Sequence, residues 1–448
     1  MVNAGGGERL LAQLVPAMAR QPGIDLVRLA VPEGAALNSQ SLNPTSQLPL
    51  EVSTITAQRP PVLEENQQQS GFQEWLWSEG RVLGLPGTSR IKRALRARFA
   101  PRLEEEDEEP EVWQQEQFQT FAEDVHLIYV FWPHQQDFPF VDKPIVCTFQ
   151  DSITLDFPEI LGGENTVAEH SRSEVWMRSA SQVVVSSEAT RKSLIRLFGV
   201  QCESAVIIHH AILPSSELIQ EMHQSPVLTP LPTQYVVFPA NTAYHKNHFA
   251  LLTAWARFSR RRHFPLVFFG TGTDALNQTH PNWPRHWHQV RLASLVARHQ
   301  LEAGKDFFAL GYTDNADVLA LVSHATALVM PTLAEGGGSY PVEEALSLGV
   351  PVLCSDIPVL REHVEGRTAR IGWFDPESPE SIVRALDDLF DNYPAYKQSA
   401  LGAMQDPRPS WDDVAAEYVA VFRTVLERSR EHVISVAAPH EMFAEAVN

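Results

Sequence analysis

Apolar positions along the chain form short runs separated by longer amphipathic segments. In the first half these runs lie at 25–31, 126–131, 144–149, 181–186 and 205–208. Segments 10–20 and 187–198 place apolar residues at the three-to-four spacing of a helix with one buried face. Short apolar strands that alternate with such helices predict parallel sheets covered on both faces.

The same alternation restarts after a segment, 214–234, that contains several Pro and Ser residues. It predicts strands at 235–238, 265–269, 307–310, 327–330 and 350–354, and helices at 247–261, 289–301, 316–322 and 342–348. We therefore expect an α/β protein with two Rossmann-like domains, 1–225 and 226–410, followed by a helix and tail, 411–448. Ligands of open α/β sheets bind beyond the carboxyl ends of the strands, so the predicted site is the cleft between the domains.

The first domain contains an expected insertion at about 37–120. Its beginning, 37–75, is polar and rich in Gln, Ser and Pro, which predicts a long loop. Further on, a basic helix candidate, Ser89–Leu103, precedes six acids at Glu104–Glu109. One interpretation is a membrane-surface helix with weak peripheral membrane contact. We favour a solvated hinge, because such charge runs usually face water.

Overall charge and cysteine usage exclude several classes of protein. The formal charge of −20 argues against nucleic acid held on a broad basic surface, but it allows a small anionic ligand in a local basic pocket. Cys147, Cys202 and Cys354 lie too far apart for a disulfide framework or a metal motif, which fits a reducing compartment. The sequence shows neither a secretory signal nor an apolar run of about 18 residues. We therefore expect a cytoplasmic protein.

Histidines at 280, 286 and 288 match no common zinc spacing, and no Asp-x-Asp pair suggests a metal–diphosphate site. A polar loop insertion explains these histidines better. The sequence therefore predicts a metal-independent site without a cofactor.

The stretch Met330–Pro358 carries the strongest functional pattern. A predicted strand ends at Met330 and is followed by Gly336, Gly337 and Gly338, then by Ser339, Tyr340 and Pro341. Pro341 is expected at the first position of a helix, where its missing N–H costs nothing. Backbone N–H groups and the positive end of that helix dipole would then face a ligand, which favours a phosphate.

Acidic residues frame this glycine loop. Glu335 precedes it, and the adjacent Glu343 and Glu344 follow it. A carboxylate that accepts two hydrogen bonds matches a vicinal diol such as a ribose. The pattern therefore predicts a nucleotide site.

The stretch resembles the family-4 group of retaining glycosyltransferases, glycosyl transferases group 1, which have the GT-B architecture. The matching residues are Glu335-Gly-Gly-Gly, Pro341, Glu344-Ala345, Gly349-Val350-Pro351 and Ser355-Asp356-Ile357-Pro358. The usual spacing of seven intervening residues pairs Glu335 with Glu343, whereas the Glu-Ala register selects Glu344. We favour Glu344 as the ribose ligand, because the downstream helix and strand determine its register.

The resemblance continues in both domains. Lys246 matches the lysine expected at the donor diphosphate, Asn241 stands where many members have arginine, and Gly311 lies in the loop expected near the base. Gly6 and Gly7 resemble the acceptor-side loop that leads into the first helix. Asp151 follows a strand end where Gln150 replaces the more common histidine; it would orient a substrate hydroxyl or cap the next segment.

The resemblance implies a hexosyltransferase in which Glu335 and Asp151 are the catalytic residues. It would move a hexose, with mannose from GDP-mannose as our first choice, from a nucleotide diphosphate sugar to a glycan, lipid-linked or small-molecule acceptor, with retention. It also implies a final helix, from Trp411, that crosses back to the first domain. A GT-B sugar-nucleotide epimerase and a non-catalytic nucleotide-sugar-binding protein remain alternatives, the latter because of Asn241, Gln150 and an apparently missing first strand.

That first strand is expected before the glycine loop, where only Met1–Ala4 are available. A strand needs about five or six residues. We therefore expect the native product to begin upstream of Met1, by roughly five to fifteen residues of a Val-, Ile- and Leu-rich segment. Alternatively, another segment fills the position, or the sheet has one strand fewer.

Overall fold

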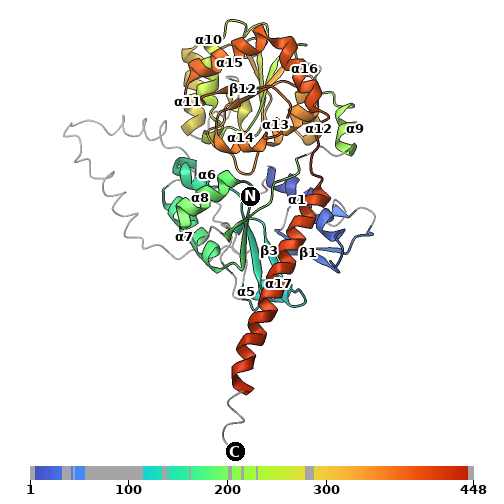
Figure 1. Cartoon of the computed structure of the whole chain (residues 1–448). Helices are drawn as coiled ribbons and strands as arrows, with labels where there is room; N and C mark the ends of the chain where they lie inside the picture. Colours follow the sequence, from blue (N-terminus) through green and yellow to red (C-terminus); the bar gives the residue numbers. More distant parts are fainter. Residues whose placement is uncertain are drawn as a thin grey trace, which may run out of the picture.

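The structure, a computed structural model, places two α/β domains one above the other, and a long C-terminal helix returns from the second domain to the first (Figure 1). It describes residues 6–32, 42–43, 46–55, 115–133, 138, 141–160, 163–199, 204–212, 216–228, 231–277 and 287–441. The basic helix candidate, the acidic run, Met1–Gly5, Cys202, His280 and His286 lie outside the described residues, so the expectations for them stay predictions.

The described residues of the first domain form two parallel sheets, one of order β1-β2 and one of order β3-β4-β5-β6. Its strands are β1 (Val27–Pro32), β2 (Leu50–Ile55), β3 (Ile128–Val130), β4 (Ile145–Phe149), β5 (Gln182–Val185) and β6 (Val206–Ile207). Its helices are α1 (Gly6–Ala19), α5 (Gln115–Ala122), α6 (Ile153–Asp156), η2 (Pro158–Ile160), α7 (Gly163–Ser179) and α8 (Glu188–Phe198). The strands expected from the apolar runs are all present.

Strand β2 corrects the expectation of a continuous loop over 37–75. Leu50 and Val52 alternate with polar residues and pack with Leu11 of α1 and Leu29 of β1 in a small apolar cluster. The polar composition of the surrounding segment concealed this two-residue period, which is the signal of a half-buried strand.

The second domain is one six-stranded parallel sheet of order β12-β11-β10-β7-β8-β9. Its strands are β7 (Val236–Pro239), β8 (Leu266–Phe269), β9 (Phe307–Ala309), β10 (Ala327–Met330), β11 (Val352–Ser355) and β12 (Ile371–Phe374). The helical segments are α9 (Ser216–Met222), η4 (Tyr244–Lys246), α10 (His248–Arg257), η5 (Thr273–Leu276), α11 (Trp287–Arg298), α12 (Asn315–Ser323), α13 (Tyr340–Ser347), α14 (Pro358–His363), α15 (Pro379–Asp391) and α16 (Tyr393–Ala403). Strand order reverses between β7 and β10, and such a switch point is where open α/β sheets bind ligands.

Helix α9 lies inside the segment expected to be a linker. Met222 is buried there against Leu319 and Ala320 of α12, and Leu218 and Ile219 pack beside it. These apolar residues have a helical spacing that the neighbouring Pro and Ser residues obscured.

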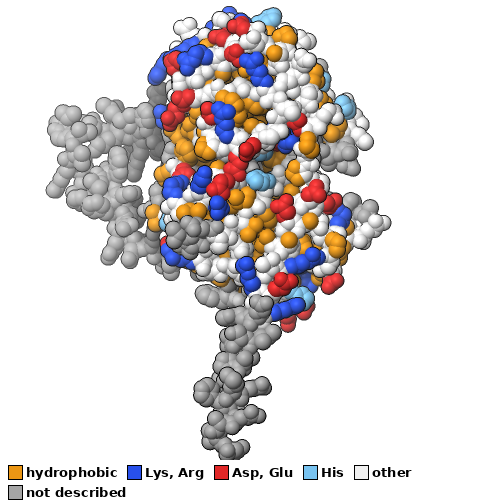
Figure 2. Space-filling model, viewed as in Figure 1, with side chains coloured by type: hydrophobic (Ala, Val, Ile, Leu, Met, Phe, Trp, Pro, Cys, Tyr) orange, Lys and Arg blue, Asp and Glu red, His pale blue; other side chains and the backbone are white. Residues whose placement is uncertain are grey.

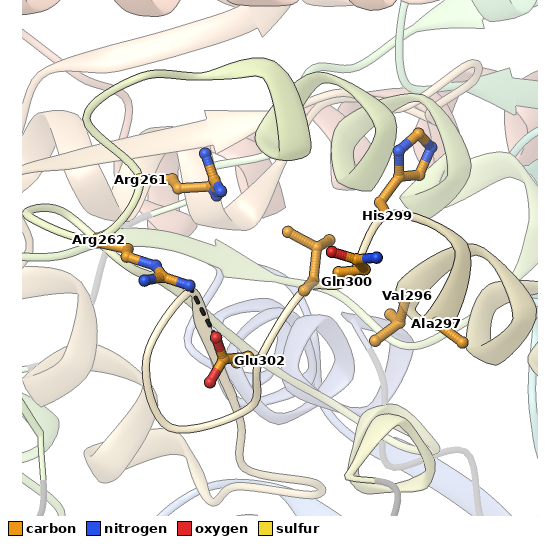
Figure 3. A pocket seen from close by; sticks show the side chains of 8 residues that line it. Arg261, Arg262, Val296, Ala297, His299, Gln300 and Glu302 are labelled. Carbon is orange, nitrogen blue, oxygen red and sulfur yellow. Dashed lines mark hydrogen bonds and ion pairs between the residues drawn. The ribbon is translucent and has the colours of Figure 1, made fainter.

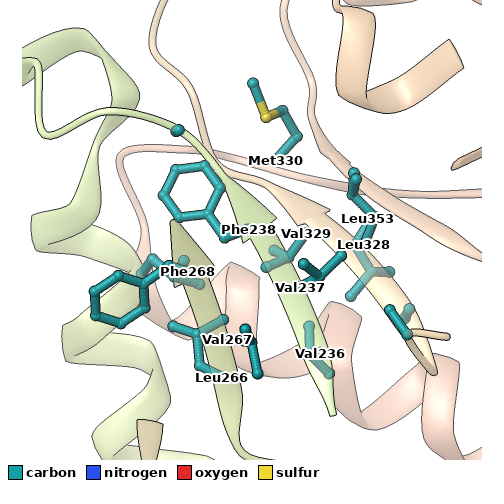
Figure 4. Packing of buried hydrophobic residues seen from close by; sticks show 14 of the residues in the cluster. Val236, Val237, Phe238, Leu266, Val267, Phe268, Leu328, Val329, Met330 and Leu353 are labelled. Atoms are coloured by element: carbon teal, nitrogen blue, oxygen red, sulfur yellow. The ribbon is translucent and has the colours of Figure 1, made fainter. Parts of the chain in front are cut away.

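The core of the second domain explains why its strands read as continuous apolar runs. Every residue of β7, β8 and β10 is buried, and their side chains interdigitate with those of β11 (Figure 4). A parallel sheet covered by helices on both faces requires apolar residues on both sides of each strand.

Helix α17 (Trp411–Glu441) ties the end of the chain to the first domain (Figure 1). Trp411, Val414 and Tyr418 are buried in one cluster with Leu14 of α1 and Val184 of β5. The expected crossover of the final helix is therefore present. Of the helices that the structure describes, not one combines the length and apolarity needed to cross a bilayer.

Surface charge on the face shown in Figure 2 is mixed, with acidic and basic side chains interspersed. One face does not test the expectation about nucleic acid, which stays a prediction.

Candidate active site

The switch point of the second sheet brings together two charged residues predicted from the sequence. Lys246 ends η4, in the loop after β7, and Glu335 lies in the loop after β10. The Lys246 Nζ atom donates to Glu335 Oε1 at 2.7 Å, and the two side chains are 17% and 9% exposed. A nearly buried ion pair therefore stands at the carboxyl ends of the central strands.

Asn247 joins these two loops and was not among the predicted site residues. Its Nδ2 donates to the carbonyl oxygens of Pro331 and Pro376 at 2.9 and 2.8 Å, and its side chain also caps α10. It has a left-handed backbone with φ of 61°, which asparagine tolerates better than most residues. The sequence signal that could have identified Asn247 was its position directly after Lys246.

The three loop glycines are required by close contacts. A Cβ atom on Gly336 would lie 3.0 Å from the Gln150 carbonyl oxygen, and one on Gly337 would lie 2.1 Å from the Ser186 side chain. Gly338 has φ of +142°, and a Cβ there would meet the His363 ring at 2.3 Å. The first two contacts reach the first domain, so the loop lies directly at the junction of the domains.

Asp151 faces this loop from the end of β4. Its Oδ1 accepts a hydrogen bond from the Ile153 backbone N–H at 2.9 Å, so it does cap the following segment. Loss of hydration raises the pKa of Asp151, the Glu335 charge raises it further, and Lys246 opposes the shift. Asp151 therefore remains available as a candidate for orienting a hydroxyl at the junction.

Glu343 and Glu344 are both buried but have different partners. Glu343 pairs with Arg367 at 3.1 Å and Arg408 at 2.9 Å, on the side of α13 that faces its own domain. Glu344 pairs with Arg9 of α1, in the first domain. Of the two glutamates, only Glu344 thus reaches a residue across the junction.

The start of α13 differs by one residue from the expectation. Ser339 is the N-cap, Tyr340 is the first helical residue and Pro341 is the second. Proline is compatible with both positions because the first N–H groups of a helix have no intrahelical partner.

Several buried polar atoms around the loop have no hydrogen-bond partner among the described residues. They are Ser186 Oγ, Ser339 Oγ, Tyr340 OH and Glu344 Oε2. Buried polar atoms are rarely left unpaired. These four atoms are therefore candidates for contact with a polar ligand at the junction.

The remaining predicted residues lie nearby with less definite roles. Asn241 is exposed, and its side chain accepts from the Ala243 N–H at 3.1 Å. Gly311, with φ of +79°, follows β9 and is buried beside η5. Gly6 and Gly7 form the first turn of α1, rather than a loop before it.

Two hollows on the surface of the described residues lie away from this site. One is lined by Arg261, Arg262, His299 and Glu302, and Figure 3 shows the Arg262–Glu302 ion pair across it. The other lies around Ser181. Both are at the amino ends of strands, the edge opposite to the switch point, where the described loops carry no comparable glycine and glutamate pattern.

No three His, Cys, Asp or Glu side chains in the described part of the chain are grouped as metal ligands. Cys147 and Cys354 are buried, and neither forms a disulfide bond within the described part of the chain. Metal independence stays a prediction.

Comparisons with known proteins agree with this geometry. Residues 220–403 match the family described as Glycosyl transferases group 1. O-antigen chain mannosyltransferase B of Escherichia coli is 26% identical over 286 residues, which cover 62% of this chain and 70% of that protein. Serotype-specific mannosyltransferase WbdA of Escherichia coli is 23% identical over 279 residues, 60% of this chain but 31% of that protein. The chain thus matches less than a third of the length of that WbdA.

Solved structures share the whole architecture. Anabaena Alr3699/HepE, in complex with UDP and glucose, is 13% identical, with a TM-score of 0.53 over 97% of each chain. Sucrose-phosphate synthase of Thermosynechococcus elongatus is also 13% identical, with a TM-score of 0.54 over 91% of this chain and 97% of that one. Such identities show the fold alone. The chain therefore has the GT-B fold, its residues 220–403 match the Glycosyl transferases group 1 family, and it is similar to mannosyltransferases.

Proposed function

We propose that this protein transfers a hexose, with mannose as our choice, from a nucleotide diphosphate sugar to a glycan or lipid-linked acceptor, with retention of the anomeric configuration. The observation that carries the proposal is the Lys246–Glu335 pair, 2.7 Å apart at the switch point and beside a glycine loop that touches the first domain. The choice of mannose rests on the similar mannosyltransferases. Retention rests on the resemblance of Glu335–Pro358 to the family-4 motif.

The donor would lie with its diphosphate against positive charge. Lys246 and the amino end of α13 would stabilise the negative charge that develops on the leaving diphosphate. Lys246 binds Oε1 of Glu335. The other carboxylate oxygen of Glu335 would accept hydrogen bonds from hydroxyls of the hexose. Glu344, with its unpartnered Oε2, would accept from the ribose, whereas two arginines occupy Glu343.

The acceptor would approach from the first domain, past Gly6, Gly7 and Asp151. In the transfer, the bond between the anomeric carbon and the diphosphate oxygen breaks, and the acceptor hydroxyl oxygen bonds to that carbon. The proton of this hydroxyl is released with the nucleoside diphosphate. Asp151 would orient the hydroxyl. Closed domains would exclude water and so limit hydrolysis of the donor.

The test combines binding and transfer. Thermal shifts with GDP, UDP and ADP identify the base, because a ligand of the folded state raises its stability. Radiolabelled GDP-mannose, or UDP-glucose if UDP is preferred, is then incubated with mannose oligosaccharides and bacterial lipid extracts. We expect labelled product with a retained anomeric configuration by NMR, and activity that persists in excess chelator.

Matched variants identify the site of transfer. Glu335→Gln should nearly abolish product formation with little change in melting temperature, whereas the exposed Glu365→Gln should transfer normally. Nucleotide binding without turnover on any acceptor would favour a non-catalytic binding protein. Conversion of the donor sugar without an acceptor would favour an epimerase.

A further inference from the structure

An arginine of the first domain reaches into the nucleotide-binding half of the junction. Arg9 lies in the first turns of α1 and forms an ion pair with Glu344 of α13. Its guanidinium carbon also lies 4.8 Å from the centroid of the Tyr340 ring. The Glu344 side chain is 1% exposed and that of Arg9 23% exposed, so a buried carboxylate is paired with a partly exposed arginine.

This ion pair leaves half of the Glu344 carboxylate unused. Arg9 Nη2 donates to Glu344 Oε1, and Oε2 has no partner among the described residues. A buried carboxylate oxygen without a donor is unfavourable. By contrast, Glu343 has Arg367 on both of its oxygens and Arg408 on one. Glu344 therefore retains the capacity to accept a hydrogen bond from a ligand at the junction.

Arg9 also opposes the effect of burial, which on balance raises the pKa of Glu344. Burial raises the pKa of Glu344, and Arg9 is the charged neighbour that lowers it. The groups that face Glu344 in the described structure are Arg9 from α1 and the Tyr340 phenol from α13 itself. Without Arg9, the carboxyl would hold a proton at higher pH and lose acceptor strength.

We propose that Arg9 is a positioning residue for the donor: it holds the carboxylate of Glu344 so that Oε2 accepts a ribose hydroxyl. This inference rests on the proposed function, in which Glu344 is the ribose ligand. It adds that the donor site is shared between the domains. Since Arg9 belongs to the first domain, the ribose ligand is correctly held only when the domains are together.

The experiment compares ligands that differ in ribose or in phosphate. Calorimetry would measure GDP, guanosine and 2′,3′-dideoxy-GDP, or the uridine series if UDP is preferred, on the full chain. The variants are Arg9→Gln, Arg9→Lys and, as a control directly after the same helix, Arg20→Gln, which removes an exposed pair with Asp412. The wild type should prefer GDP over its dideoxy analogue by about 10-fold or more, as for hydrogen bonds to a charged group.

In Arg9→Gln the ratio of the affinity for GDP to that for dideoxy-GDP should fall to nearly one. The affinities for GDP and guanosine should decrease by the same factor. Arg9→Lys should restore part of the preference, and Arg20→Gln should leave it unchanged. GDP affinity of Arg9→Gln should also decrease between pH 8 and 6, while the wild-type affinity stays level. In a double-mutant cycle, Glu344→Gln should abolish the effect of Arg9→Gln.

Other results would overturn the inference. A loss for GDP much larger than that for guanosine would mean that Arg9 contacts phosphate directly. Unchanged ribose preference in Arg9→Gln would mean that Arg9 does not act through Glu344. In both cases wild-type nucleotide binding, and with it the proposed function, still stands. A wild type that binds none of these ligands would overturn the proposed function itself. If Arg9→Gln does not fold, Arg9→Lys and the pH profile provide the test.

Discussion

At the scale of residues, two adjacent glutamates illustrate how helix geometry separates roles. Successive side chains on a helix point about 100° apart. Glu343 therefore faces Arg367 and Arg408 of its own domain, and Glu344 faces Arg9 across the junction. The two glutamates therefore have partners in different domains.

We predict opposite outcomes for Glu343→Gln and Glu344→Gln. Glu343→Gln leaves two largely buried arginines without their carboxylate, which should cost about 3–5 kcal/mol and lower the melting temperature. Glu344→Gln should raise the donor KM and change the melting temperature less. Thermal denaturation and donor titrations measure both. The reverse ranking of KM effects would assign the ribose to Glu343.

The lysine at the switch point gives a second prediction. Lys246→Met should weaken binding of a nucleoside diphosphate by about 10- to 100-fold, because a charge-assisted contact contributes roughly 1.5–3 kcal/mol. Nucleoside binding should change little. Calorimetry with the nucleoside diphosphate and with the nucleoside measures the two losses of affinity. The control variant is Lys305→Met, because Lys305 is exposed and, among the described residues, forms an ion pair only with Glu302. Equal losses for the two ligands would mean that Lys246 only supports the loop.

At the scale of elements, the glycine loop connects β10 to α13 and contacts the first domain. Its shape depends on missing side chains, since Gly336 lies against the Gln150 backbone and Gly337 against Ser186. The amino end of α13 is thereby placed at the junction. A side chain added at Gly336 or Gly337 should therefore disturb the contact between the domains more than the fold of either domain.

Gly337→Ala should lower transfer activity strongly and leave each domain folded. Its Cβ would lie 2.1 Å from the Ser186 side chain, so the loop must retreat from β5. Adding Ser186→Gly removes the obstructing atoms and should restore part of the activity. Gly402→Ala, in α16 with nothing within 4 Å, is the control and should be neutral. Failure of the double variant to recover would indicate that the loop needs glycine for another reason.

At the scale of the whole molecule, a second carboxylate holds the domains together. Glu362 of α14 accepts hydrogen bonds from the backbone N–H groups of Glu188 and Ala189, at 2.6 and 3.0 Å, where α8 begins. His209 Nε2 lies 3.2 Å from the same carboxylate. A negative charge is favourable at a helix amino end, so this contact stabilises the closed arrangement.

Glu362→Gln should therefore loosen the closed arrangement. The amide keeps one acceptor oxygen and loses its charge, at a cost of about 1–3 kcal/mol. We expect a larger radius of gyration by small-angle X-ray scattering in the absence of donor, and a lower kcat. The control is Glu365→Gln, an exposed residue just after α14, which should behave as the wild type. An unchanged scattering profile would show that α17 and the Arg9–Glu344 pair suffice for closure.

The sequence by itself determined the two α/β domains and the location of the candidate site. Continuous apolar runs specify buried parallel strands, and the Glu335–Pro358 pattern can be recognised because its residues are close together in the chain. Elements with weak local signals, β2 and α9, escaped this reasoning because polar neighbours concealed their few apolar contacts.

Only the tertiary structure decided which side chains meet. Glu344 has its partner 335 positions away, and Glu362 reaches a helix 174 positions away. No local pattern encodes such pairs, because they depend on how two separately folded domains are joined by α17 and the loops between them. The environment of a charged residue, and with it its role, is therefore a property of the folded molecule, even where its position in a motif is plain in the sequence.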